Sequence, residues 1–322
     1  MPGGKKVQLG EGAFVAATRV WRVLVLDLVG FRLLMARHPE FGQTIDAAAK
    51  AAPAGEQTRR MTMLDIEGAS APLLDITGAR ATIRLNRPRH HNRLESDDLG
   101  VLLKLFDQVE ADPALRVLVL TGTGRTFSSG YDLGSVAERA VSATEQQSAG
   151  SAFEAVADRL ENLGMPTICR LNGGVYGGST DLALACDFRI GVDTAEMFMP
   201  AARLGLHYYK SGIQRYVSRL GADNAKMLFL TAQKISAPEM LRIGYLTAMV
   251  PAAALDAEVD RIANILAGNA PMAMAGMKRA INEFARGKLD EAAADQRHRE
   301  SMRGAEIREG IRARAEKRPP KF

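Results

Sequence analysis

From about residue 64 onward, short hydrophobic runs alternate with segments of helical periodicity. Two alternating runs separated by Thr77-Gly78 are typical of a β-hairpin. Apolar runs predict three more strands, and apolar positions three and four residues apart predict helices between them. This order of elements favours an α/β fold with parallel strands joined by right-handed crossovers. The predicted strands are 73–76, 81–85, 117–120, 167–171 and 188–192, and the helices are 96–111, with Ser96 as cap, 153–162 and 179–186.

The two ends of the chain differ from this middle part. From Ile213 onward only helices are predicted. Residues 1–60 contain an apolar segment without a clean polar face, followed by an Ala/Pro/Gly-rich linker at 47–55. A start at Met61 or Met63 would make this extension dispensable. We therefore divide the chain into an N-terminal extension (1–60), a core (61–265) and a C-terminal helical region (266–322); the helices expected after the core strands are 213–220, 222–230, 237–243, 255–269, 272–286 and 289–301.

Composition excludes several classes of protein. The 322-residue chain is 47% hydrophobic and 25% charged, which is ordinary for a globular protein and too apolar for a disordered one. No run of about 18 apolar residues predicts a membrane span. Cys169 and Cys186 cannot form a disulfide framework and are expected in the core. We expect a cytoplasmic protein.

The net charge of +5 is concentrated in one segment. Residues 297–322 hold nine Lys/Arg and four Asp/Glu, so the rest of the chain is neutral. A basic excess confined to a tail indicates a local anion site rather than a nucleic-acid-binding face. The expected partner is therefore small and negatively charged.

Two glycine-rich loops, 121–132 and 172–181, each follow an apolar strand. The second leads directly into a helix, for which Ser179 is the expected cap. Glycine lets backbone N–H groups approach a ligand closely, and a helix N-terminus stabilises an oxyanion. Neither loop has the spacing of a dinucleotide fingerprint or a P-loop. The loops are either tight turns or an oxyanion site for an enolate or thioester.

Four segments with motif character follow one another along the chain. They are Asn86-Arg87-Pro88 with Asn92, the strand 117–121, Phe127-Ser128-Ser129-Gly130-Tyr131-Asp132-Leu133, and Asn172 with Gly177-Gly178, Asp181 and Cys186-Asp187. In this order they resemble the motifs of the enoyl-CoA hydratase/isomerase (crotonase) superfamily, and the resemblance covers residues 64–322. It implies a spiral of ββα units followed by a C-terminal helical trimerisation region, assembled as a homotrimer or hexamer.

The resemblance also implies a substrate and a mechanism. The backbone N–H groups of Tyr131 and Gly178 would bind the thioester carbonyl of an acyl-CoA and stabilise the enolate. Ser129, in the same motif, is expected to contact coenzyme A. Coenzyme A enters as part of the substrate, and no permanently bound cofactor or metal is expected. The tyrosine at 131 departs from the smaller residue that the family often has, and its phenol would line the acyl pocket.

Hydratases of the family use two glutamates, and this chain departs from both. Asp181 stands at the first position and is one methylene shorter, and Ala201 stands at the second. The expected acid/base set is therefore non-standard, with Asp181 as its retained carboxylate. Alternatively, Asp181 only stabilises the dipole of its helix.

The next segment, 203–212, places His, two Tyr and Lys in consecutive positions. His207 is a candidate replacement proton donor, because histidine titrates near neutral pH. The segment is similar to that of methylmalonyl-CoA decarboxylase, whose active-site tyrosine matches Tyr208. The alternative is that the aromatic side chains only pack and His207 faces solvent.

The basic tail resembles the C-terminal segment with which the family covers coenzyme A. Lys317 and Lys321 are candidates for binding its 3′-phosphate, since a cation is a good phosphate partner. The alternative is a solvated, charged helix end.

We therefore expect an acyl-CoA lyase or isomerase of this superfamily. Decarboxylation, hydration of an unusual substrate and isomerisation all stay open, and the absence of a carboxylate at Ala201 disfavours a simple isomerase. The alternative to an enzyme is a catalytically weak CoA-binding scaffold subunit. The neutral body of the chain disfavours RNA binding.

Overall fold

A mostly parallel sheet lies at the centre of the fold. The computed structural model describes residues 71–132 and 143–322, and within 143–150 only the backbone. β1 and β2 form the predicted antiparallel hairpin, with Gly78 at a φ of 56° in the turn. The other strands are parallel, in the order β1-β2-β3-β5-β7-β10. The sheet comprises β1 (Leu73–Thr77), β2 (Arg80–Leu85), β3 (Val117–Gly122), β5 (Thr167–Leu171), β7 (Phe188–Val192) and β10 (Ala248–Val250).

A second, smaller sheet has the order β4-β6-β8-β9. β4, β6 and β8 are parallel, and β9 pairs antiparallel with β8. After each of β3, β5 and β7 the chain adds one strand to this second sheet and then turns into helical structure. This repeat confirms the spiral of ββα units expected from the sequence. The strands are β4 (Thr126–Ser128), β6 (Gly174–Tyr176), β8 (Glu196–Phe198) and β9 (Ile235–Ser236).

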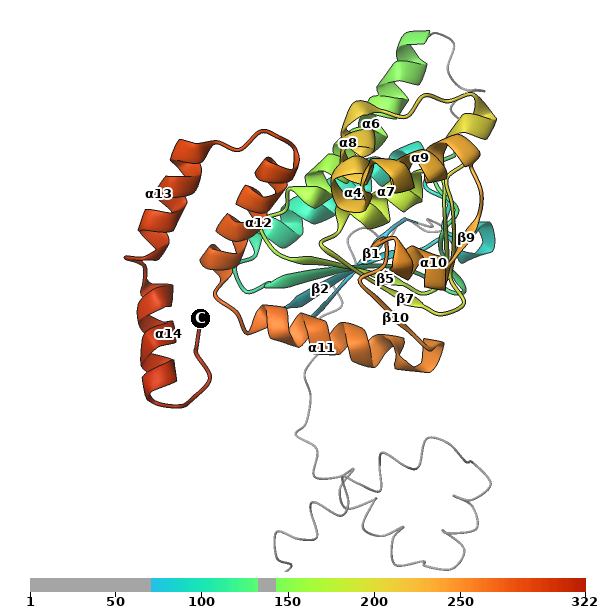
Figure 1. Cartoon of the computed structure of the whole chain (residues 1–322). Coiled ribbons are helices and arrows are strands. Elements are labelled where there is room, and N and C mark those ends of the chain that lie inside the picture. The colour runs from blue at the N-terminus through green and yellow to red at the C-terminus, as the bar shows by residue number, and fades with distance from the viewer. Residues whose placement is uncertain (1–70, 133–142) are drawn as a thin grey trace, which may run out of the picture. The chain divides into compact units, whose positions relative to one another are not determined.

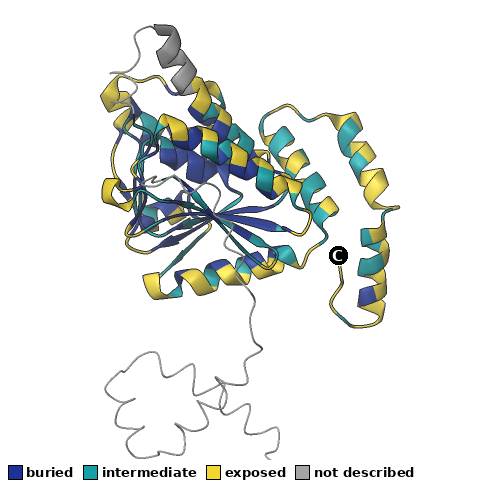
Figure 2. Ribbon diagram, turned by 180° about the vertical axis from the view of Figure 1, so that it is seen from behind, coloured by how far each residue is buried: buried dark blue, intermediate teal, exposed yellow. Residues whose placement is uncertain are grey.

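Helices cover both faces of the larger sheet (Figure 1). α4, α6, α7, α8 and α9 lie on one face, and α11 lies on the other. Buried positions concentrate between these layers (Figure 2). The helices of this part are α4 (Ser96–Ala111), α6 (Ala143–Glu161), α7 (Gly178–Ala185), α8 (Lys210–Leu220), α9 (Ala222–Thr231), α10 (Ala237–Arg242) and α11 (Leu255–Ala267), with short 3-10 turns at Pro88–His90, Ala201–Leu204 and Ala252–Ala254.

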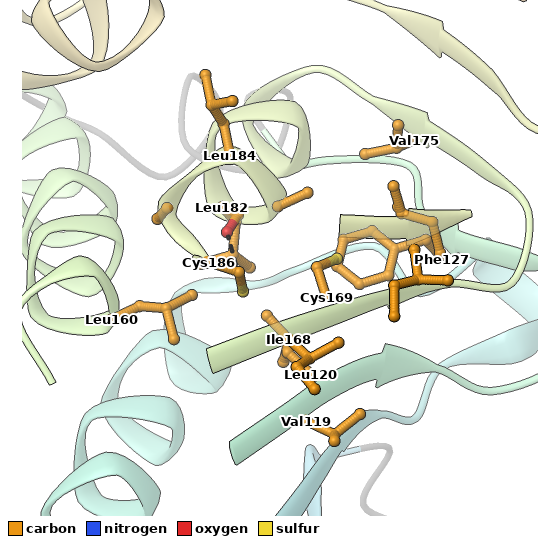
Figure 3. Packing of buried hydrophobic residues seen from close by; sticks show 14 of the residues in the cluster. Val119, Leu120, Phe127, Leu160, Ile168, Cys169, Val175, Leu182, Leu184 and Cys186 are labelled. Carbon is orange, nitrogen blue, oxygen red and sulfur yellow. Dashed lines mark hydrogen bonds between the residues drawn. The ribbon is translucent and has the colours of Figure 1, made fainter. Parts of the chain in front are cut away.

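The hydrophobic core joins the strands to α7. Figure 3 shows Leu120 and Ile168 of the large sheet close to Leu182 of α7 and to Cys186, the residue that ends this helix. The first seven residues after Gly178 in α7 are all buried. A helix that is buried on every side holds its first turn in a fixed place, and this first turn belongs to the second glycine loop. As expected, Cys169 and Cys186 are free thiols within the core.

The C-terminal region consists of α12 (Pro271–Ala285), α13 (Glu291–Ser301) and α14 (Ala305–Ala315). α12 contacts the core through Lys278, whose Nζ lies 2.9 Å from the carbonyl oxygen of Met165 and 2.7 Å from a carboxylate oxygen of Asp187. α13 and α14 continue beyond α12 (Figure 1). The predicted boundary at 265/266 falls in the last turn of α11, and the boundary at 60/61 lies outside the described residues.

The helix ends differ from two expectations. Glu95, not Ser96, caps α4, through a capping box in which Asp98 bonds back to the Glu95 N–H. Gly177, with a φ of 56°, precedes α7, and Ser179 lies inside the helix with its hydroxyl on Ser128 Oγ. Both predicted caps were wrong by one or two residues, because each serine makes contacts within the fold instead. Among the described residues, no helix combines the length and hydropathy that a membrane span requires.

Candidate active site

The two glycine-rich loops meet at the carboxyl ends of β4 and β6. These strands are parallel neighbours, with Thr126 opposite Gly174. Gly130 follows β4 at a φ of +100°, and a Cβ there would lie 2.8 Å from the Tyr176 carbonyl oxygen and 3.4 Å from the Gly178 nitrogen. Only glycine permits this conformation and this close approach. The backbone around Tyr131 therefore lies beside the first turn of α7.

Two backbone N–H groups at this junction differ from their neighbours in their hydrogen bonding. The neighbouring amides of Gly130, Asp132 and Gly177 donate to Ser128 Oγ, the Leu94 carbonyl and the Phe198 carbonyl at 3.1, 2.9 and 2.8 Å. Within the described chain, the N–H groups of Tyr131 and Gly178 have no acceptor. Unpaired amides next to buried structure are rare and mark a place where a ligand can accept.

Side-chain amides hold the loops in place. Asn92 Nδ2 donates to the carbonyls of Thr126 and Thr123 at 2.7 and 2.9 Å. Asn172 Nδ2 donates to the Gly124 carbonyl at 2.7 Å, and its Oδ1 accepts from the Gly122 N–H at 3.2 Å. These bonds give the two asparagines of the sequence motifs a structural role.

Aromatic rings lie above the first turn of α7. The Phe153 ring covers Gly178, because a Cβ at 178 would lie 2.9 Å from its Cζ. Its centroid is 5.6 Å from that of Tyr131 and 6.3 Å from that of Tyr209. The Tyr131 hydroxyl lies 3.0 Å from Ser96 Oγ. The Tyr131 ring is therefore half-buried beside the loop junction, and its place in an acyl pocket stays a prediction.

Asp181 lies one turn after Gly178 on the same face of α7, and it is completely buried. Its Oδ2 accepts a hydrogen bond from the Tyr209 hydroxyl and another from Arg215 Nη1 at 2.6 Å. Its Oδ1 is buried without a partner. Burial raises the pKa of Asp181, and the opposing effects of Arg215 and Tyr209 do not offset it. The carboxyl therefore holds a proton more firmly than an exposed aspartate does.

The contact with Tyr209 was not predicted from the sequence, which directed attention to Tyr208. Tyr208 is 7% exposed and stacks on Tyr209 with 4.4 Å between centroids. Its hydroxyl lies 3.4 Å from that of Tyr209, so Tyr208 is connected to Asp181 through the Tyr209 hydroxyl. Burial raises the pKa of both phenols, so each is a neutral hydrogen-bond donor near neutral pH.

Arg215 was also missed, although the sequence contained a signal for it. The buried positions of α8 are Gly212, Arg215, Tyr216 and Leu220, which share one face of the helix. A charged residue on an apolar face indicates a buried ion pair. Arg215 is paired with Asp181 at 2.6 Å, Asp158 at 2.6 Å and Glu161 at 3.1 Å.

Three further residues singled out in the sequence are His207, Ala201 and Ser129. His207 is exposed and makes no hydrogen bond or ion pair within the described chain, whereas Ala201 is buried. Ser129 lines a surface groove of about 510 Å³ together with His91, Arg125 and Tyr176.

Lys317 and Lys321 are exposed, and the C-terminus that follows them reaches the other end of the large sheet. The carbonyl of the last residue, Phe322, accepts a hydrogen bond from Arg116, which precedes β3, at 2.6 Å. The loop junction lies beyond the opposite, carboxyl end of the same strand. Among the described residues, no group of three His, Cys, Asp or Glu side chains could hold a metal ion.

Comparisons with known proteins agree on one family. The profile of the enoyl-CoA hydratase/isomerase family matches residues 75–322. The short-chain-enoyl-CoA hydratase of Clostridium acetobutylicum is 34% identical over 223 residues, covering 69% of this chain and 85% of the relative. The carnitinyl-CoA dehydratase of Proteus mirabilis is 31% identical over 256 residues, covering 77% and 97%. The crystal structure of an enoyl-CoA hydratase from Bacillus anthracis superposes with a TM-score of 0.71 at 30% identity, covering 78% of this chain and 98% of that one. With its ββα spiral and a family profile that spans most of its length, the chain belongs to the enoyl-CoA hydratase/isomerase family.

Proposed function

We propose that this protein binds an acyl-CoA thioester and stabilises its enolate through the N–H groups of Tyr131 and Gly178. The observation that carries the proposal is the meeting of two loops whose amides at these positions have no acceptor within the described chain. Gly178 also opens α7, so the helix dipole adds positive potential at the same place. Two such donors aimed at a developing oxyanion contribute about 3–4 kcal/mol each in the transition state.

Asp181, with Tyr209 on its Oδ2, is the proposed proton-transfer group. Its free Oδ1 is the position at which the carboxyl can hold and deliver a proton. A carboxyl with a raised pKa is suited to act as a general acid near neutral pH. Because Ala201 carries no carboxylate, Asp181 is proposed as the single acid/base group in place of the two glutamates.

The first candidate reaction is addition of water to an enoyl-CoA, or its reversal, as the names of the relatives suggest. The second candidate is decarboxylation of a malonyl-type thioester. Ala201 favours it, because loss of CO2 needs enolate stabilisation and a late proton donor but no second carboxylate to activate water. His207 remains a proposed alternative donor, and a CoA-binding scaffold without turnover remains the alternative of another class.

Coenzyme A is proposed to enter along the groove beside Ser129. Arg125 in this groove is an exposed cation, which suits a phosphate. Lys317 and Lys321 lie at the opposite end of β3, so their proposed contact with the 3′-phosphate requires the site of a second copy of the chain. The two free thiols support the proposed cytoplasmic location.

Self-association through the C-terminal region is therefore part of the proposal. Large apolar side chains are exposed along α12 and beyond it, which is unusual for a surface that stays in water. Sedimentation velocity is expected to give three or six times the 34.8 kDa of one chain, and Phe284→Glu is expected to lower this mass. A wild-type monomer at micromolar concentration would contradict the proposal. The exposed residues are Met272, Met277, Ile281, Phe284, Met302, Ile311 and Phe322.

A panel of thioesters tests the reaction. Purified protein is incubated with enoyl-CoA and malonyl-type CoA substrates, and the products are weighed by mass spectrometry. A gain of about 18 Da identifies hydration and a loss of about 44 Da identifies decarboxylation, and both rely on the same enolate stabilisation. A mock purification from the same host without this chain serves as the control for activity from contaminating enzymes. Binding of CoA thioesters without turnover of any of them would favour the scaffold alternative.

A further inference from the structure

A chain of ion pairs connects Asp181 to the end of α12, and all of its side chains except the half-buried Arg286 are buried. Arg215 Nη1 lies 2.6 Å from Asp181 Oδ2, and Arg215 Nε lies 3.1 Å from Glu161 Oε2. The same Glu161 oxygen pairs with Arg286 Nη2. Only two side chains, Arg215 and Glu161, therefore separate Asp181 from a residue of the C-terminal region.

Burial makes this connection electrostatically effective. The side chains of Asp181, Arg215 and Glu161 are 0%, 1% and 5% exposed. Charges that are removed from water are screened little, so a change at one of them acts on the others over several ångströms. The short ion pairs on the protein surface lack this property.

The end of α12 is attached to the core at the same place. Arg286 caps α12, and its carbonyl accepts a hydrogen bond from Gln214, the residue before Arg215, at 2.7 Å. Asn282 Nδ2 donates to the Glu161 carbonyl at 3.0 Å. The docking of α12 and the position of the Arg215 guanidinium therefore depend on the same few contacts.

We propose that Glu161 and Arg286 are positioning residues that, through Arg215, set how firmly Asp181 holds its proton. The attachment of the C-terminal region thereby adjusts the proton-transfer group. The effect on the pKa of Asp181 does not depend on the proposed function. Only the effect on turnover does, because it requires Asp181 to transfer the proton.

Arg286 and Glu161 are expected to shift the pKa of Asp181 in opposite directions. Arg286 and Arg219 both compensate the charge of Glu161, and Arg286 shares with Arg215 the oxygen Oε2. Removing Arg286 therefore leaves Arg215 attracted more strongly to Glu161 and less available to Asp181. The pKa of Asp181 then rises. Removing the charge of Glu161 frees Arg215 for Asp181 and removes a nearby negative charge, so the pKa of Asp181 falls.

The charged and titratable groups around Asp181 come from three parts of the chain. They are Tyr208, Tyr209, Arg215 and Tyr216 from α8 and the loop before it, Asp158 and Glu161 from α6, and Tyr245 after α10.

Infrared titration of the full-length protein tests the proposal without substrate. The protonated carboxyl band of Asp181 is assigned as the one absent from Asp181→Asn. We expect its midpoint to move up by about one pH unit in Arg286→Met and down by a similar amount in Glu161→Gln, as a unit charge removed at about 10 Å would do. Arg286→Lys keeps the charge and is expected to restore most of the shift.

Lys278→Met is the matched control. Lys278 also fastens α12 to the core, through Met165 and Asp187, but it does not touch the chain of ion pairs. It is expected to leave the midpoint unchanged. Equal shifts in Lys278→Met and Arg286→Met, or no shift in Arg286→Met, would overturn the proposal.

If Glu161→Gln does not fold, the Met and Lys variants of Arg286 decide alone. The infrared midpoint can shift as expected while the pH profile of turnover stays unchanged. That result would support the inference and count against the proposed role of Asp181 in proton transfer.

Discussion

Gly178→Pro is expected to lower turnover about 100- to 1,000-fold relative to Gly178→Ala, the loss seen when one oxyanion donor is removed. Proline lacks the N–H group that we assign to the thioester oxygen. Steady-state kinetics with the active thioester measure the ratio. The effect is expected in kcat rather than in KM, because the donor matters most when the oxygen carries the enolate charge.

The alanine variant is the necessary control, since either substitution adds a Cβ. That atom would lie 2.9 Å from Cζ of Phe153, so the ring must move in both variants. Position 178 is the first of α7, where proline is tolerated because the N–H bonds to no helical carbonyl. Equal turnover of the two variants, both folded by circular dichroism, would refute the assigned role of this amide.

The elements that position the site were predictable because they are long enough to carry a pattern. β3, β5 and β7 have five or six residues, nearly all buried, and they appear in the sequence as apolar runs. β4, β6 and β8 have three residues each, too few for any periodicity. Their existence follows from pairing between segments far apart in sequence. The glycine loops were found because they interrupt the pattern at the strand ends.

The partners of Asp181 could not be derived in the same way. Tyr208 and Tyr209 are adjacent, and only the backbone before α8 decides which hydroxyl reaches α7. Arg215 lies 34 residues from Asp181 and 54 from Glu161. No local spacing predicts such contacts. The missed helix α14 has a different cause: its sequence is dominated by charged residues and alanine, and only Ala313 is buried.

Asp181→Asn is expected to lower turnover about 100- to 10,000-fold, the range for loss of a positioned general acid or base. Tyr209→Phe removes one hydrogen bond to the same carboxyl and is expected to cost about 10- to 100-fold. It should also move the limb of the pH profile that belongs to Asp181. His207→Gln is the comparison variant, because His207 is exposed and makes no hydrogen bond or ion pair within the part of the chain that the structure describes. A changed profile in His207→Gln with an unchanged one in Tyr209→Phe would assign the proton to histidine.

Stability distinguishes the catalytic role of Asp181 from a purely structural one. Because burial raises its pKa in the folded state, its contribution to stability is full below the unfolded-state pKa of about 3.9 and is lost as pH rises through the folded-state pKa. The asparagine of the Asp181→Asn variant is neutral throughout. The free energy of unfolding of the wild type minus that of the variant, measured in urea between pH 4 and pH 8, should therefore fall with rising pH. A difference that increases with pH would mean that the ionised carboxylate mainly holds Arg215, as in a structural ion pair. An acid that destabilises the fold when it ionises, and that lies one helical turn after an amide without an acceptor in the described chain, is better explained by proton transfer than by packing.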